Sequence, residues 1–251
     1  MTIDNPKLHH IPALRALWKE AFGDTDAFLD LFFSSAFSPD RCRCVFCGDD
    51  PVAVLYWFDC QYGDRTIAYL YAIATRKDRQ GQGLCARLMA QTHDYLASRK
   101  YAGTILVPGS ASLFRFYARQ GYANATYVRR FSCEAAAAPA PLQAIGPEEY
   151  GLLRKQLLPE GSVIQEGENL AFLQTLCRLY RTEDALAAVY EKDGILHCYE
   201  LLGPSEQAPG ILAALGFREG RFTVPGTQTP YTMYHPLHEA AAPAYFGLGF
   251  E

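Results

Sequence analysis

The stretch RQGQGLCARLM, residues 79–89, constrains the fold of this chain more than any other. It directly follows the apolar run IAYLYAIAT at 67–75, which is rich in the β-branched and aromatic residues of strands. After it, Leu84, Leu88 and Tyr95 fall on one face of a helix. Gly81 and Gly83 therefore lie at a strand-to-helix turn, where backbone N–H groups and the positive end of the helix dipole can bind a phosphate.

Other kinds of glycine loop fit this stretch less well. A dinucleotide-binding turn needs G-x-G-x-x-G in a parallel unit and an acidic residue about twenty positions on. Ala86 is a tolerated third position, but the next strand ends in Pro108 without an acidic residue. A P-loop needs GK[ST], and no Lys follows these glycines. The loop residues alone are equally compatible with a plain flexible strand-to-helix turn that binds no phosphate.

The elements around the loop have a definite order. Asn5 and Pro6 predict the start of a first helix that Gly23 ends, and a second helix is expected over residues 25–36. RCRCVFC, PVAVLYWFDC and RTIAYLYAIAT predict an antiparallel meander that leads into the loop. After the loop helix come a strand at GTILVPG, a helix closed by Gly121, and a strand at ATYVRRFSC.

The second half of the chain repeats this pattern in a shorter form. EAAAAPAPLQ, residues 134–143, is small, Pro-containing and aperiodic, and predicts a domain boundary. Helical patterns follow around EEYGLLRKQLL and NLAFLQTLCRLY, and then a hairpin that turns at residues 192–194. ILAALGF at 211–217 echoes FYARQGY at 116–122, but no G-x-G loop occurs here, so we expect no second nucleotide site.

Composition limits the class of protein. The chain has 251 residues and a net charge of −4, and no Lys/Arg stripe that would serve a nucleic acid. The start lacks a signal-peptide core and no apolar run could span a bilayer, so we expect a cytoplasmic protein with no membrane partner. Cys42, Cys44 and Cys47 raise the question of zinc, but no second cysteine pair exists, and strand alternation puts Cys47 on the opposite face. We expect no metal, and the oligomeric state stays open.

Together, these elements resemble the GNAT superfamily of acyl-CoA-dependent N-acyltransferases over residues 1 to about 134. The family signature Q/R-x-x-G-x-G/A matches Gln80-Gly81-Gln82-Gly83-Leu84-Cys85, with Cys85 where Gly or Ala is usual. The preceding AIAT is similar to the family's coenzyme-A strand, and FYARQGY to its last helix. The resemblance implies an α/β (α+β) GNAT fold, with a mixed, mostly antiparallel sheet flanked by helices.

Within the superfamily the chain is most similar to tandem proteins with a smaller, degenerate second GNAT-like domain, such as the enhanced-intracellular-survival-type aminoglycoside acetyltransferases. This implies a GNAT domain over residues 1–135 that binds acetyl-CoA. Residues 143–251 would form the degenerate domain and one wall of the acceptor pocket. Those relatives carry a further C-terminal domain, so substrate identity does not transfer.

The resemblance also implies roles for individual residues. The backbone of Ile73, Ala74 and Thr75 would bind the pantetheine arm, and one N–H there would face the developing oxyanion. The N–H groups of the signature would bind the pyrophosphate of coenzyme A, from Gln80, Gly81, Gln82, Gly83, Leu84 and Cys85. Ser110 stands where many relatives have a cofactor-binding Asn, although a plain helix N-cap is an equal alternative.

Catalysis needs an acid and a base. Tyr117 matches the family's proton donor to the departing thiolate, with core packing as the alternative. The coenzyme strand lacks the carboxylate that many relatives use as base, so Asp59, His93 and His197 stay open as candidates. The tail AYFGLGFE is too apolar to remain in water, and its docking would carry the α-carboxylate of Glu251 inward. In the tandem relatives the chain terminus acts as base, so Glu251 is a further candidate beside simple docking.

The expected function is transfer of an acetyl group from acetyl-CoA to a primary amine of a small molecule or peptide. One alternative is a catalytically inactive acyl-CoA-binding regulatory module. Another is aminoacyl transfer from tRNA, which the acidic balance disfavours.

Overall fold

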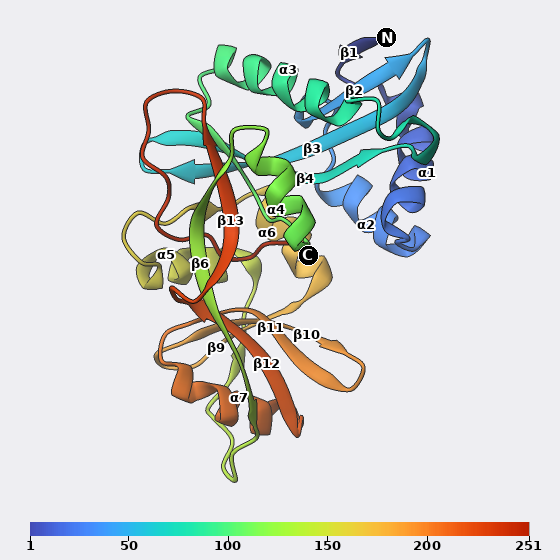
Figure 1. Cartoon of the computed structure of the whole chain (residues 1–251). Coiled ribbons are helices and arrows are strands. Elements are labelled where there is room, and N and C mark those ends of the chain that lie inside the picture. Colours follow the sequence, from blue (N-terminus) through green and yellow to red (C-terminus); the bar gives the residue numbers. More distant parts are fainter. Residues whose placement is uncertain (251) are drawn as a thin grey trace. The chain divides into compact units, whose positions relative to one another are not determined.

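The computed structural model describes residues 1–250, which form two compact units (Figure 1). Neither unit is a single stretch of chain. Unit 1 comprises residues 1–60, 64–123 and 233–242. Unit 2 comprises residues 61–63, 124–232 and the tail from Pro243 onward.

Unit 1 contains most of the predicted first domain. Its helices are η1 (Leu8–His10), α1 (Ile11–Phe22), α2 (Asp26–Ser35), η2 (Pro39–Arg41), η3 (Lys77–Arg79), α3 (Leu84–Ser98) and α4 (Ala111–Ala118). Its first five strands are β1 (Thr2–Asp4), β2 (Cys42–Cys47), β3 (Asp50–Tyr62), β4 (Arg65–Thr75) and β5 (Gly103–Leu106). Among residues 1–250, no helix is both long and apolar enough to cross a membrane.

The sheet of unit 1 separates two apolar layers. Leu55 and Trp57 of β3 point to α3, where they pack with Leu88 and Met89. On the other face, Tyr56 packs against the rings of Trp18 and Phe32, from α1 and α2. Successive strand residues point to opposite faces, so the nearly continuous apolar runs of β3 and β4 bury both sides of the sheet.

The first long helix begins later than Asn5 and Pro6 predict. α1 starts at Ile11, and Gly23, with a φ of 76°, ends it as expected. The Asn5 side chain instead donates to the carbonyl of Pro39 at 2.9 Å and accepts from Arg43 Nη1 at 2.9 Å. These bonds join the residue after β1 to η2 and to β2, so the Asn5 side chain is not used as a helix cap.

Unit 2 also consists of strands and helices, with fewer helices than unit 1. Its strands are β6 (Ala123–Glu134), β7 (Gln143–Ala144), β8 (Ile164–Gln165), β9 (Arg178–Arg181), β10 (Leu186–Lys192), β11 (Ile195–Leu202), β12 (Glu219–Pro225) and the start of β13 (Thr229–Pro236). Its helices are α5 (Pro147–Leu157), α6 (Glu168–Leu176), η4 (Ser205–Gln207) and α7 (Ala208–Leu215). The β10–β11 hairpin turns at Asp193 and Gly194, both with positive φ, as the sequence predicts.

Each unit contains one parallel strand pair joined by a helix. In unit 1, α3 connects the parallel strands β4 and β5. In unit 2, α7 connects the parallel strands β11 and β12. The short helix that ends at Gly216 therefore has the place of α3 in the topology, although its sequence echoes α4. The internal repeat is thus present in the connections of the strands.

The last strands of the two halves are exchanged. β6 follows α4 along the chain but pairs antiparallel with β12 of unit 2. Residues 233–236 of β13, which follow β12, pair antiparallel with β5 of unit 1. The compact units are therefore not divided by a single boundary at 134–143. The functional division into 1–135 and 143–251 stays a prediction.

The C-terminal tail is buried in unit 2. The side chains of Tyr245, Phe246, Leu248 and Phe250 are each at most 6% exposed. Gln165 Nε2 donates to the carbonyl of Leu248 at 3.1 Å, and the N–H of Gly249 donates to Tyr231 Oη at 3.0 Å. The expected docking of the tail is confirmed up to Phe250, whereas Glu251 lies outside the described residues.

Candidate functional site

The end of β4 extends beyond its parallel partner. β4 pairs with β5 only at Ala68 and Tyr69. β5 ends at Leu106, and Pro108 soon after it has no N–H to continue a ladder. The backbone of Ile73, Ala74 and Thr75 therefore lies past the last β4–β5 pair, on a strand edge that an extended ligand could join.

The backbone of β4 is irregular just before these residues. Ala72 has a φ of 48°, which is unusual for a residue with a side chain and costs about 1–3 kcal/mol. Such a conformation inside a strand turns the following peptide groups away from regular pairing. Sequence analysis missed this feature, because nothing about the alanine in AIAT announces a positive φ.

The glycine loop leaves open space beside Gly81 and Gly83, while the N–H of Gln80 donates to the carbonyl of Lys77 at 3.4 Å. Gly81 and Gly83 have φ values of 74° and 73°, and a Cβ built on either would meet no heavy atom within 4 Å. Gly83 is the N-cap of α3, and no side chain caps this helix or adds an acidic group to its first turn. The first N–H groups of a fifteen-residue helix are thus available to an anion, as pyrophosphate binding requires.

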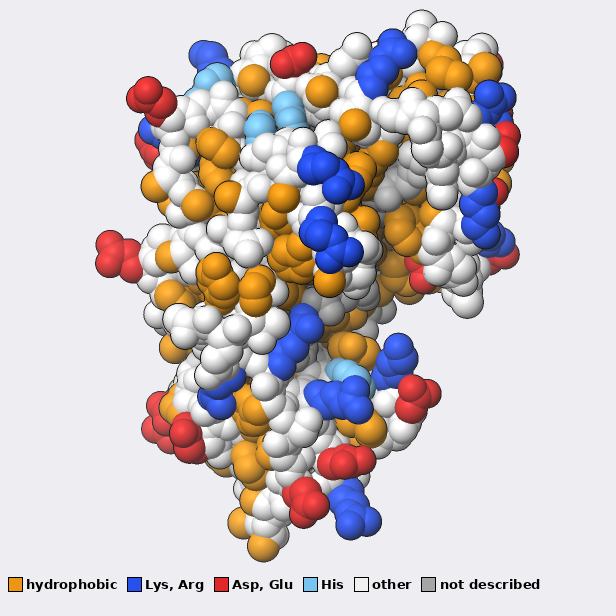
Figure 2. Space-filling model, viewed as in Figure 1, with side chains coloured by type: hydrophobic (Ala, Val, Ile, Leu, Met, Phe, Trp, Pro, Cys, Tyr) orange, Lys and Arg blue, Asp and Glu red, His pale blue; other side chains and the backbone are white. Residues whose placement is uncertain are grey.

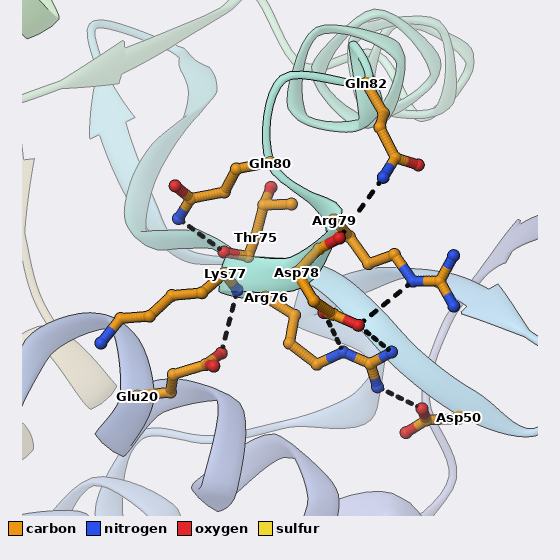
Figure 3. A network of polar contacts seen from close by, with 9 residues as sticks. All are labelled: Glu20, Asp50, Thr75, Arg76, Lys77, Asp78, Arg79, Gln80 and Gln82. Carbon is orange, nitrogen blue, oxygen red and sulfur yellow. Dashed lines mark hydrogen bonds and ion pairs between the residues drawn. The ribbon is translucent and has the colours of Figure 1, made fainter.

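A polar network fixes the chain just before the loop (Figure 3). The Arg76 guanidinium lies between two carboxylates and pairs with Asp50 and with Asp78, at 2.7 Å to the latter. Gln80 Nε2 donates to the carbonyl of Thr75 at 3.1 Å and joins the loop to the end of β4. The roles of Arg76 and Asp78 were missed from the sequence, where RKDR gives only a cluster of charges.

Cys85 and Tyr117 meet at the start of α3. With Ile73, they belong to one apolar cluster between α3, α4 and the sheet. Burial raises the pKa of the Cys85 thiol to about 11, and burial together with nearby Cys85 raises the pKa of the Tyr117 phenol. Tyr117 therefore remains protonated at neutral pH, beside the signature loop and the β4 edge.

Ser110 caps a helix. Its hydroxyl accepts from the N–H of Leu113 at 3.4 Å and contacts the Ser112 hydroxyl at 2.8 Å. This is the N-cap geometry that the sequence offered as an alternative, and the side chain stays exposed. A bond to coenzyme A from Ser110 remains a prediction.

The candidate bases have different surroundings. Asp59 accepts a hydrogen bond from Tyr101 Oη at 2.7 Å, and His93 Nε2 lies 2.9 Å from Tyr122 Oη. Burial and the stacked His235 lower the pKa of His93 to about 4, so its ring is neutral. His197 belongs to unit 2, whereas Asp59 and His93 belong to unit 1.

Two groups of metal-ligand side chains have structural explanations. His10 Nδ1 accepts from the N–H of Lys7 at 2.9 Å, so Nε2 carries the proton that it shares with Asp49 at 3.0 Å. A metal bound to His10 Nε2 would have to displace that proton. His9 also contacts Asp49, which explains why the three side chains lie close together without a metal. Cys42 and Cys44 are buried with their sulfurs 4.0 Å apart, while Cys47, at the end of β2, is exposed.

Comparison with known proteins identifies the fold. Residues 2–125 match the model of the acetyltransferase (GNAT) domain. Through this segment, the chain belongs to the GNAT superfamily. A search of curated proteins found no match.

Solved GNAT structures resemble most of the chain. A GCN5-related N-acetyltransferase from Kribbella flavida aligns with a TM-score of 0.70 at 17% identity, covering 93% of this chain and 70% of the other. One from Anabaena variabilis gives 0.73 at 12%, covering 94% and 73%. Eis1 from Mycobacterium abscessus gives 0.67 at 12%, covering 94% and 74%. At such identities the likeness establishes the fold alone, and the tandem GNAT-like architecture of this chain fits it.

Membership of the superfamily gives the general chemistry. GNAT proteins transfer acyl groups from an acyl-CoA to an acceptor, so this chain is assigned to the acyltransferases. The uncapped start of α3, the open space at Gly81 and Gly83, and the free edge of β4 are compatible with such a cosubstrate.

Proposed function

We propose that this protein transfers an acetyl group from acetyl-CoA to a primary amine of a small molecule or peptide. The observation that carries the proposal is the shared position of the β4 edge, the uncapped glycine loop and Tyr117 in unit 1. The N–H groups at residues 80–85 would bind the pyrophosphate. The backbone at 73–75 would pair with the pantetheine arm.

The chemistry would proceed by direct attack. The neutral amine nitrogen forms a bond to the thioester carbonyl carbon, and an N–H group near Ala74 stabilises the negative oxygen. When the C–S bond breaks, the thiolate takes a proton from Tyr117. An ammonium of pKa about 10.4 is neutral in only about one part in 2,500 at pH 7, so a base is needed. We propose the α-carboxylate of Glu251 for this role, because the neighbouring tail residues up to Phe250 are buried.

The test is an acceptor screen with acetyl-CoA, in which free thiol is measured against a panel of primary amines. Turnover with a subset of amines supports the proposal. Tight binding of coenzyme A without turnover on any amine would instead indicate an acyl-CoA-binding regulatory module. The screen must use the full chain, because truncation at residue 135 removes the β13 residues that pair with β5.

A further inference from the structure

The parallel pairing in unit 2 is short, as it is in unit 1. β11 and β12 pair at three positions only, and the last pair joins Cys198 to Phe222. At the next position β11 has a bulge: Ala188 pairs with Glu200 and Val189 with Cys198, which leaves Tyr199 as an extra residue. Bulges re-aim side chains and often lie beside binding sites.

A cavity of about 380 Å³ lies at this point. All its lining residues belong to unit 2, on strands β6, β10, β11, β12 and β13. Its volume is in the range that holds a small molecule. The unit lacks a glycine loop, so the cavity is suited to something other than a nucleotide of the kind expected in unit 1.

Three flat rings form one side of the cavity. Tyr190 stacks on His197 with ring centroids 5.1 Å apart, and on Tyr199 with centroids 4.5 Å apart. Such an array offers ring faces and edges to a planar ligand. Burial, followed by the positive charge of Arg221, lowers the pKa of His197, so the imidazole is neutral at pH 7.

The charged residues of the cavity are cationic. Arg130 and Arg221 line it from β6 and β12, with the Arg130 guanidinium 5.6 Å from the Tyr231 ring centre. Arg221 makes no ion pair with any residue in the described part of the chain, and no Asp or Glu occurs among the described lining residues. The neighbouring turn adds Lys192 and Asp193, which carry one charge of each sign. Figure 2 shows Lys and Arg side chains around a pale-blue histidine in the lower part of the view.

We propose that this cavity is a binding site for a small planar organic anion, an aromatic ring that carries a carboxylate or phosphate. The arginines bind the anionic group through charge-assisted hydrogen bonds, and the stacked rings of Tyr190 and Tyr199 hold the aromatic part. The cavity is lined by residues of unit 2, whereas the proposed coenzyme A site is built from residues of unit 1. Binding to the cavity is tested without turnover, so its failure and that of the proposed function are distinguishable.

The test is calorimetric titration of the full chain, free of coenzyme A, with phenyl phosphate and benzoate. Inorganic phosphate and the neutral benzyl alcohol serve as ligand controls. Arg221→Gln should weaken binding of both aromatic anions by about tenfold or more, because a charge-assisted bond is lost. Tyr190→Leu should reduce phenyl phosphate binding to the level of inorganic phosphate.

Arg129→Gln is the matched control. Arg129 is next to Arg130 on β6 but is not among the residues that line the cavity; its guanidinium lies over the ring of Phe131, which does line it. Binding should therefore be unchanged in this variant. The proposal is overturned if neither aromatic anion binds, if Arg129→Gln weakens binding as much as Arg221→Gln, or if benzyl alcohol or inorganic phosphate binds equally well.

Discussion

Gln80 and Thr75 are joined by a hydrogen bond of 3.1 Å from the side-chain amide to the backbone carbonyl, which links the glycine loop to the end of β4. Gln80→Ala removes this link but no part of the loop backbone. We expect coenzyme A affinity to fall by about 0.5–1.5 kcal/mol, or two- to tenfold, measured by calorimetry. Gln61→Ala, which loses a weaker bond to the carbonyl of Gly63, is the control and should bind normally. Equal affinities in both variants would show that the link does not order the loop.

We expect Gly83 to be needed at the loop for its backbone conformation and for the close approach of a phosphate. Gly83→Val places a β-branched side chain at a φ of 73° where a phosphate would bind, so coenzyme A affinity should fall at least tenfold, by about 1.4 kcal/mol. Gly48, with a φ of 67° and equally open surroundings, lies in the β2–β3 turn and suffers the same strain. Gly48→Val should therefore lose similar stability in urea but keep its affinity. Loss of affinity in both variants would point to strain as the cause.

The sequence predicts these local features because they depend on nearby residues. Glycines between a strand and an amphipathic helix, Gly23 as the end of α1, and the Asp193–Gly194 turn all act within a few positions. The predicted start of α1 was wrong, because Asn5 contacts Pro39 and Arg43, and these two residues are distant from it in sequence. The final residues RLY of NLAFLQTLCRLY are strand β9 and not helix, since pairing with β10 outweighs local propensity.

The strand exchange could not be predicted for a similar reason. The alternating pattern of β6 shows that it is a strand, but it contains no information about its partner. The same holds for β13, which pairs with β5 rather than remaining wholly with its own half. Alternation also could not predict the positive φ of Ala72. The family signature, by contrast, did predict that Ile73, Cys85 and Tyr117 lie near one another, because it defines the order of the elements.

Tyr117 should matter for turnover more than for binding. Its raised pKa keeps the phenol protonated, as a proton donor requires, and Tyr117→Phe preserves the packing of the ring. We expect turnover to fall by about 10²–10⁴-fold, with coenzyme A affinity nearly unchanged. The control is Tyr122→Phe, which loses hydrogen bonds to Thr104 and His93. It should lower stability by about 1 kcal/mol and keep its turnover. Normal turnover of Tyr117→Phe would assign the residue to packing.

The neutral, buried His93 should make the stability depend on pH. Its pKa is about 4 in the folded protein and about 6.5 when unfolded, so the unfolded chain binds a proton first as the pH falls. The free energy of unfolding should have its full value above pH 6.5. It should then fall toward pH 4, by at most about 3 kcal/mol. Urea unfolding at pH 7, 6 and 5 measures this loss. His93→Gln should reduce it, whereas the exposed His9→Gln should not; identical pH profiles for the two variants would contradict the assignment.

The C-terminal carboxylate is tested best by extending the chain. Deletion of residues 249–251 would also remove the bond from the Gly249 N–H to Tyr231 and the contact of Phe250 with Phe172, whose ring centres are 5.0 Å apart. Two glycines added after Glu251 leave these contacts in place and move only the α-carboxylate. If that carboxylate is the base, turnover should fall by about 10²-fold or more, because general bases contribute on this scale, while coenzyme A affinity stays constant. Two glycines added before Met1 control for the extension itself. Should the C-terminally extended chain keep full turnover, the base is another group, and the buried tail has only a structural role.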